Sequence, residues 1–188
     1  WFSDEPKHFY FFLLGKAVIA FFGFNTIFSN NAVSGVLQYF PDDTLRLYQN
    51  STQSQSTSVY RDPVSHVQLT FVQSGANAAA VFIDNTQVLA NVNTNSYNGA
   101  VLHYLGRSSA GDYLDGYLSA VCFIDGQALT PSAFGQIHPR TGQWRPKSKA
   151  AIRAAVAVGG GTRNGWGANR FFLPSDDTTS TTTIGYDR

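Results

Sequence analysis

Carboxylate pairs are the first groups to consider, because retaining glycoside hydrolases need two carboxyl groups about 5–5.5 Å apart. The chain has a single glutamate, Glu5, and two aspartate pairs, Asp42–Asp43 and Asp112–Asp115. Both aspartate pairs lie beside Pro or Gly in segments typical of turns, where Asp side chains bond to nearby backbone. We therefore expect no catalytic residue and predict that the chain is not an enzyme.

Metal ligands are also sparse in this sequence. His8, His66, His103 and His138 are scattered, and no two of them have the spacing of a zinc-binding helix motif. Loop aspartates and main-chain carbonyls can bind Ca²⁺, but the chain has no Asp-x-Asp-x-Asp series. Cys122 lies in an apolar segment, where a buried and unreactive thiol is expected. We expect no metal site and no cofactor, with a loop Ca²⁺ as the alternative.

Sugar binding is the chemistry that best suits the side chains of the predicted loops. An aromatic ring stacks on the apolar face of a pyranose, while amides and carboxylates bond to its hydroxyl groups. For each aromatic side chain the alternative is a half-buried packing role, which is common in all-β proteins. The candidate glycan-binding residues are Tyr97, Asn98, Asp112, Tyr113, Asn164 and Trp166.

Charge is distributed unevenly along the 188 residues, although the net charge is only +1. Residues 1–125 have a net charge of −4, residues 126–175 carry seven Lys or Arg and no acid, and the last 13 residues have a net charge of −2. The nearly neutral whole argues against nucleic acid and favours a basic extension that is solvated or docks on an acidic neighbouring subunit. The candidate docking residues are Arg140, Trp144, Arg145, Lys147, Lys149 and Arg153.

The most apolar segment, Phe9–Phe28, is about as long as the 20 residues that a membrane-spanning helix requires. Lys16 near its middle makes insertion unfavourable. Its aromatic and β-branched residues, interrupted at Gly15 and Gly23, favour two buried strands. We therefore predict no membrane span.

Short apolar segments separated by turn residues recur at intervals of about 8–12 residues, a pattern typical of an antiparallel sandwich or jelly roll. Pro41-Asp42-Asp43 and Asp84-Asn85 are predicted turns between strands, and the polar segments 49–58 and 93–99 are predicted loops. The predicted strands are 36–40, 45–48, 67–71, 81–83, 87–92, 101–105 and 117–124.

The composition changes after Asp125. We predict a capped helical turn at residues 130–134, no regular structure at 138–148 and a short helix at Lys149–Val158. This divides the chain into a jelly-roll sandwich, residues 1–128, and a mostly irregular basic extension, residues 129–188. The extension is expected to pack on the sandwich or on a neighbouring chain.

The second half of the chain contains a series of short motifs. They are GR (106–107), DGYL (115–118), FIDGQAL (123–129), FG (134–135) and TGQWRPK (141–147). Their order resembles that in bacteriophage tail-fibre, tailspike and related virion proteins with a laminin-G or concanavalin A-like jelly roll. Residues 60–67, 83–88 and 166–173 resemble further segments of that family, although its aromatic pair before His66 is absent.

The resemblance implies an all-β, antiparallel jelly-roll sandwich in a virion protein, and it transfers no catalytic residues. We expect a non-enzymatic module of a tail fibre or other host-recognition appendage that binds a host-surface glycan. The expected partners are other copies of the chain in a homotrimer and other virion proteins. The alternatives are a purely structural virion protein, such as a capsid decoration, head fibre or tail component, and a depolymerase fragment whose active site lies elsewhere.

Overall fold

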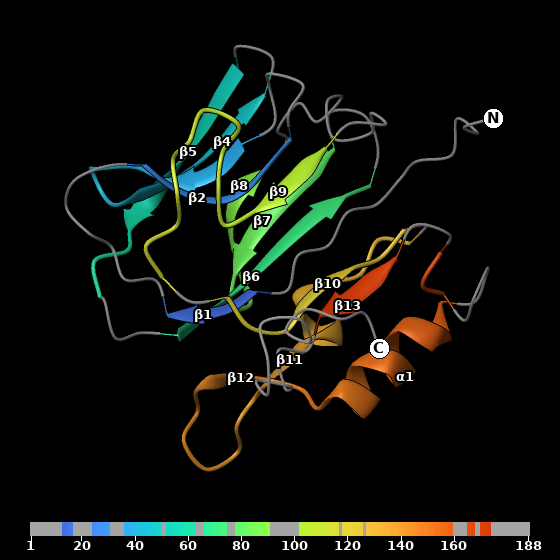
Figure 1. The fold of residues 1–188 in the computed structure, drawn as a ribbon. Helices are drawn as coiled ribbons and strands as arrows, with labels where there is room; N and C mark the ends of the chain where they lie inside the picture. Colours follow the sequence, from blue (N-terminus) through green and yellow to red (C-terminus); the bar gives the residue numbers. More distant parts are fainter. Residues whose placement is uncertain are drawn as a thin grey trace, which may run out of the picture.

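The computed structural model describes residues 13–16, 24–30, 36–49, 52–62, 66–74, 78–90, 102–116, 118–125, 127–159, 165–167 and 170–173. Within these residues the chain consists mostly of β-strands paired in antiparallel sheets, with one α-helix (Figure 1). The predicted all-β class, with antiparallel pairing, is confirmed.

The larger sheet has the strand order β5-β4-β3-β2-β9. Strands β2 to β5 follow one another as an antiparallel meander, and β9 pairs with the other side of β2. Every residue of β2 is buried, as expected for an inner strand. The strands are β2 (Asn25–Asn30), β3 (Val36–Tyr39), β4 (Thr44–Gln49), β5 (Thr52–Val59) and β9 (His103–Leu105).

A second sheet has the strand order β1-β6-β7-β8. Its strands β6, β7 and β8 also form a meander, and β1 pairs with the outer side of β6. The strands are β1 (Leu13–Lys16), β6 (His66–Gln73), β7 (Ala79–Ile83) and β8 (Thr86–Ala90).

One hydrophobic core joins the two larger sheets. It forms because alternate side chains of each strand point to the same side, as in Leu45 and Leu47 of β4 and Val81 and Ile83 of β7. Removing these apolar groups from water is the main favourable contribution to folding. The buried core residues are Ile27, Phe28, Leu37, Tyr39, Leu45, Leu47, Leu69, Phe71, Ala79, Val81, Ile83, Leu89, Val121 and Phe123.

A second core lies beside the first and contains the helix. Here β10 (Val121–Phe123) pairs with β13 (Phe171–Leu173), and β11 (Gly135–Ile137) pairs with β12 (Trp144–Pro146). Helix α1 (Lys149–Val158) buries one apolar stripe, and Figure 1 shows it on the same side of the molecule as these four strands. The buried residues of this second core are Cys122, Ile124, Ala133, Phe134, Ile152, Val156, Trp166 and Phe172.

The two turns predicted from Asp and Asn are confirmed. Asp43, between β3 and β4, has a φ of 63°, and Asp84, between β7 and β8, has a φ of 54°. Both values lie in the left-handed region, which Asp tolerates better than most residues. Asp42 stabilises the first turn, since its Oδ1 accepts hydrogen bonds from the backbone N–H and the hydroxyl of Thr44.

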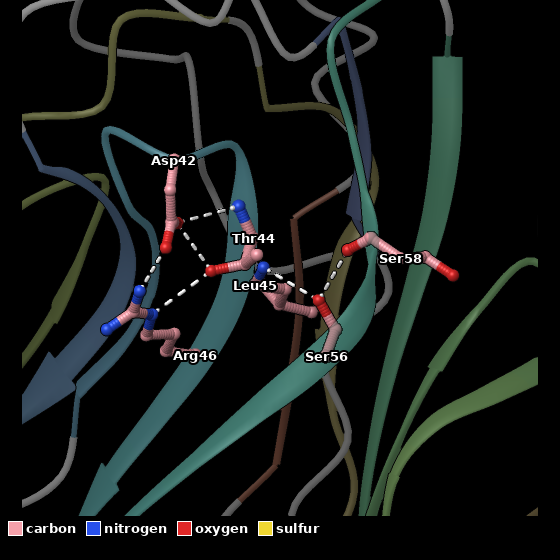
Figure 2. Close-up of polar contacts among 6 residues, drawn as sticks. All are labelled: Asp42, Thr44, Leu45, Arg46, Ser56 and Ser58. Carbon is pink, nitrogen blue, oxygen red and sulfur yellow. Dashed lines mark hydrogen bonds and ion pairs between the residues drawn. The ribbon is translucent and has the colours of Figure 1, made fainter.

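The prediction of a loop over residues 49–58 was wrong, because most of this polar segment forms β5. An edge strand needs little apolar surface, and the backbone pairing with β4 supplies its hydrogen bonds. Ser56 fills an irregularity in this pairing: its hydroxyl accepts from Leu45 N at 3.0 Å and donates to Ser58 O at 2.8 Å (Figure 2).

The predicted strand 117–124 is shorter in the structure, where β10 starts at Val121. Ala120 has a φ of 53°, which interrupts the extended backbone immediately before this strand. Val121 and Phe123 belong to the core between the two larger sheets, so they do not form an exposed apolar face for a neighbouring chain.

The apolar segment 9–28 contains β1 and the start of β2. Gly15 lies inside β1 and pairs with Val67. The prediction that the strand is interrupted at Gly15 was therefore wrong. Glycine keeps its backbone N–H and C=O for the ladder, although it adds no side chain to pack. Among the described residues, no helix is long and apolar enough to cross a membrane.

The C-terminal predictions are partly confirmed. Residues Pro131–Ala133 form a helical turn, and α1 has the predicted bounds, with the Ser148 hydroxyl accepting from Ala151 N at its start. Segment 138–148, predicted to be irregular, instead contributes β12 to a hairpin, in which His138 N donates to Gln143 O at 2.7 Å.

Candidate functional site

The loop that follows β9 carries two of the predicted glycan-binding residues. The chain leaves β9 through Gly106, whose φ of 71° lies in the left-handed region that favours glycine. Arg107 and Tyr113 then form an isolated antiparallel bridge, and Gly111, with a φ of 98°, lies in the turn between them. We call residues 106–113 the Arg107 loop.

Ser108 and Asp112 close the Arg107 loop. Ser108 N donates to Asp112 O at 2.8 Å, and Asp112 N donates to Ser108 Oγ at 3.0 Å. The Ser108 hydroxyl in turn donates to Asp112 Oδ2 at 3.0 Å. One carboxylate oxygen of Asp112 therefore stabilises the turn, in agreement with the turn interpretation of this residue.

The larger sheet positions the Arg107 loop through its buried strand β2. The hydroxyl of Ser29 donates to Arg107 O at 2.8 Å, and Asp115 N, just beyond the loop, donates to Asn25 Oδ1 at 2.9 Å. Leu114, between these two contacts, packs against the main core. The loop is thus attached to the sheet on either side of its exposed residues.

Two tyrosines flank the guanidinium group of Arg107. Its Cζ atom lies 4.6 Å from the ring centre of Tyr104 in β9 and 5.8 Å from that of Tyr113. Tyr113 is 64% exposed, and Arg107 Nε donates to Ser108 O at 3.3 Å. We call Tyr104, Arg107, Asp112 and Tyr113 the Arg107 platform.

The Arg107 platform offers the interactions that a sugar requires. Tyr113 provides an exposed aromatic ring, Arg107 provides N–H donors, and the carboxylate of Asp112 provides an acceptor. Groups of this kind recognise a ligand by stacking and hydrogen bonding, so the arrangement is suited to binding.

Of the other predicted glycan-binding residues, the structure describes Trp166. Tyr97, Asn98 and Asn164 lie outside the described residues. Trp166 is 9% exposed, belongs to the second core and meets Phe172 edge to face with ring centres 6.2 Å apart. The packing role, which was the alternative for each aromatic residue, fits Trp166.

Sequence reasoning did not identify Tyr104 and Arg107 as binding candidates. Arg107 was noted only within the GR motif, and the bridge that brings it to Tyr113 follows neither a helical nor a strand periodicity. The available signal was the pair of glycines at positions 106 and 111, which bracket a turn. Tyr104 was visible only as part of the predicted strand 101–105.

Some of the predicted docking residues make contacts within their own chain. The indole Nε1 of Trp144 donates to Gln68 Oε1 at 2.8 Å, and Lys147 Nζ donates to Ser132 O at 2.6 Å. The first contact joins β12 to β6, so it attaches the C-terminal part of the chain to the four-stranded sheet.

The remaining basic candidates lie in the same C-terminal region. Lys149 Nζ is 5.5 Å from the ring centre of Phe172. Arg140, Arg145 and Arg153 have exposed side chains, the first two in or beside the β11–β12 hairpin and the third on α1. Their predicted role in docking on a neighbouring subunit stays a prediction.

A second group of charged and aromatic side chains lies on β4 and the turn before it. Arg46 forms an ion pair with Asp42 and donates to the hydroxyl of Thr44, as Figure 2 shows. The hydrogen bond from the Thr44 hydroxyl, followed by those from the Thr44 backbone N–H and from Arg46, lowers the pKa of the Asp42 carboxyl. The Arg46 guanidinium also lies 3.9 Å from the ring centre of Phe40. These groups satisfy one another, which indicates a structural role.

A half-buried polar group lies at the end of the sheets where β7 turns into β8. Burial raises the pKa of Asp84, whose Oδ1 accepts from Gln68 N at 2.9 Å. Burial also raises the pKa values of Tyr39 and Tyr60, whose rings pack edge to face with centres 5.8 Å apart. Burial therefore disfavours the charged form of each of these side chains, and Tyr39 is enclosed in the core.

Among the described residues, no three His, Cys, Asp or Glu side chains gather to hold a metal ion. No protein-family model, curated protein or solved structure matches the chain.

Proposed function

We propose that this chain is a non-enzymatic module of a bacteriophage virion, in a tail fibre or another host-recognition appendage, that binds a host-surface glycan. The observation that carries the proposal is the Arg107 platform, where the exposed ring of Tyr113 lies beside the Arg107 guanidinium. The resemblance to phage virion proteins adds independent support. Two of the motifs that carry this resemblance border the site: GR lies at the start of the Arg107 loop, and DGYL follows the loop.

The proposed architecture is a jelly-roll sandwich. Two observations support this architecture. The two antiparallel sheets share one hydrophobic core, and strands that are distant in the sequence, such as β2 and β9, pair within one sheet. In such a fold the loops at the sheet ends are the surfaces open to a ligand, since the inner sheet faces pack on each other.

Stacking and polar contacts together give the platform its expected selectivity for sugars. The ring of Tyr113 covers the C–H face of one pyranose, while Arg107 donates to its oxygen atoms. Asp112 accepts from a hydroxyl group through the oxygen that Ser108 does not occupy. The attachment of the loop to β2 holds these groups in place before binding, which reduces the entropy that binding costs.

The test is binding of the purified chain to an array of bacterial surface polysaccharides. We expect one or a few polysaccharides to bind, and we expect Tyr113→Ala to weaken that binding at least tenfold. Ile137→Ala is the matched control, because Ile137 is 63% exposed but lies in β11. Absence of binding to every polysaccharide, or equal loss in both variants, would contradict the proposal.

A structural role in the virion is the second candidate. It is favoured by the exposed side chains of Ile137, Arg140 and Arg145 in the β11–β12 hairpin, because apolar and arginine side chains together suit a protein partner. In this role the chain forms a homotrimer through its basic C-terminal part. Measurement of the molar mass by light scattering distinguishes a trimer from a monomer, and the triple replacement of these three residues by Ser is expected to dissociate it.

A further inference from the structure

Arg107 differs from the other two arginines within residues 1–125. Arg46 forms an ion pair with Asp42, and Arg61 Nε lies 2.6 Å from Asp43 Oδ2. Among the described residues, Arg107 has no ion-pair partner. Its only charged neighbour in the loop, Asp112, directs one oxygen to Ser108 instead.

The Arg107 guanidinium is nevertheless held in a defined orientation. Its Nε donates to Ser108 O, and its Cζ lies over the rings of Tyr104 and Tyr113. Aromatic rings attract a cation through their faces without occupying its N–H groups. With respect to the described residues, the terminal N–H groups therefore stay available in the planar fork that matches a carboxylate or a phosphate.

We propose that the glycan bound by the Arg107 platform is acidic, and that Arg107 pairs with a carboxylate or phosphate group on it. This inference rests on the proposed function and specifies its ligand class. The oxyanion lies against the guanidinium fork, while the adjoining sugar ring stacks on Tyr113. Asp112 accepts from a hydroxyl group on a neighbouring carbon, so its charge lies to the side of the bound anion.

Three polymers test this inference on the intact chain. Polygalacturonate carries a carboxylate on each sugar, its carboxyl-reduced form is the corresponding neutral galactan, and polyglycerol phosphate carries phosphates. We expect polygalacturonate, polyglycerol phosphate or both to bind at least tenfold more tightly than the galactan at about 0.15 M salt, where distant surface charges are largely screened. Which of the two anionic polymers binds identifies the oxyanion.

Arg107→Lys separates pairing at the fork from general charge attraction. Lysine keeps the positive charge but lacks the bidentate geometry, so we expect the preference for the anionic polymer to fall at least fivefold. Arg61→Lys is the matched control, because Arg61 is exposed and belongs neither to the Arg107 platform nor to the predicted docking residues. Its affinity is expected to stay within twofold of the wild type. Thermal unfolding checks that both variants fold.

Three results would overturn the inference. They are equal binding of polygalacturonate and galactan, binding of none of the three polymers, and equal loss in the Arg107→Lys and Arg61→Lys variants. If the polysaccharide array identifies only neutral ligands that depend on Tyr113, the proposed function stands and this inference fails. If no polysaccharide binds at all, both fail.

Discussion

Trp144 and Gln68 are 76 positions apart, and the indole Nε1 of Trp144 donates a hydrogen bond to Gln68 Oε1 at 2.8 Å. Gln68 is buried in β6, and its Nε2 donates to Pro131 O at 3.3 Å. One side chain of the four-stranded sheet therefore bonds to two segments of the C-terminal part.

Replacing Trp144 by Phe is expected to destabilise the protein by about 1–3 kcal/mol, because the buried Gln68 carbonyl loses its donor. Urea unfolding followed by circular dichroism measures this change. Gln136→Ala, at an exposed position of the same hairpin, is the control and is expected to change stability by less than about 0.5 kcal/mol. Equal effects would show that the indole contact contributes little.

Gly135→Ala tests how tightly this contact is packed. An added Cβ would clash with Gln68 Oε1 and Trp144 Nε1, so the indole must shift. Overpacking of this kind costs about 1–3 kcal/mol. In the Trp144→Ala background the same change is expected to cost much less, since the nearest ring is gone. If the destabilisations caused by Gly135→Ala and Trp144→Ala simply add in the double variant, the close packing of Gly135 against Trp144 is contradicted.

Helix α1 offers a pair of matched valines. Val156 is completely buried in the second core, whereas Val158 is 88% exposed. Val156→Ala is expected to destabilise the protein by about 1–3 kcal/mol through lost burial and a residual cavity. Val158→Ala should be neutral or slightly stabilising, because Ala has the higher helix propensity. Similar unfolding midpoints for the two variants would show that α1 is not packed as described.

Asp84 gives the stability a specific pH dependence. Burial raises its pKa above the ordinary value of 3.8, so the folded protein holds this proton more tightly than the unfolded chain. The stability from this group is complete below pH 3.8 and is lost as the pH rises through the folded pKa. Asp84→Asn removes the ionisable carboxyl and therefore this loss of stability at higher pH. The Asn side chain keeps an oxygen that can accept the hydrogen bond from Gln68 N.

The melting temperature of Asp84→Asn is therefore expected to exceed that of the wild type at pH 7. The difference should shrink as the pH falls toward 4. Asp62→Asn is the control, because Asp62 is an exposed aspartate. A variant that melts below the wild type at pH 7 would contradict the assignment of burial as the cause.

The features predictable from the sequence are those fixed by local chemistry. Asp43 and Asp84 tolerate a positive φ, which made both turns recognisable. The apolar segments 67–71 and 81–83 indicated the strands β6 and β7, although β6 was expected to be half-buried and its residues 68–71 are all buried. Pro131 marked the start of a helical turn. Each of these signals depends on neighbours within a few residues.

The features that could not be predicted depend on distant partners. The Gln and Ser residues of β5 look like a loop until β4 provides backbone pairing. Trp166 was judged by residue type, but its burial is decided by Phe172 and α1. Arg107 becomes a candidate binding residue only once the fold brings its guanidinium over the rings of Tyr104 and Tyr113.

The most direct test of the glycan-binding platform is a backbone amide NMR titration with the polysaccharide that binds most tightly on the array. We predict that the largest chemical-shift changes fall on residues 107–113, with a change at the Arg107 Nε–H signal. Changes confined to the β11–β12 hairpin, or no change at saturating polysaccharide, would contradict the placement of the site on this loop.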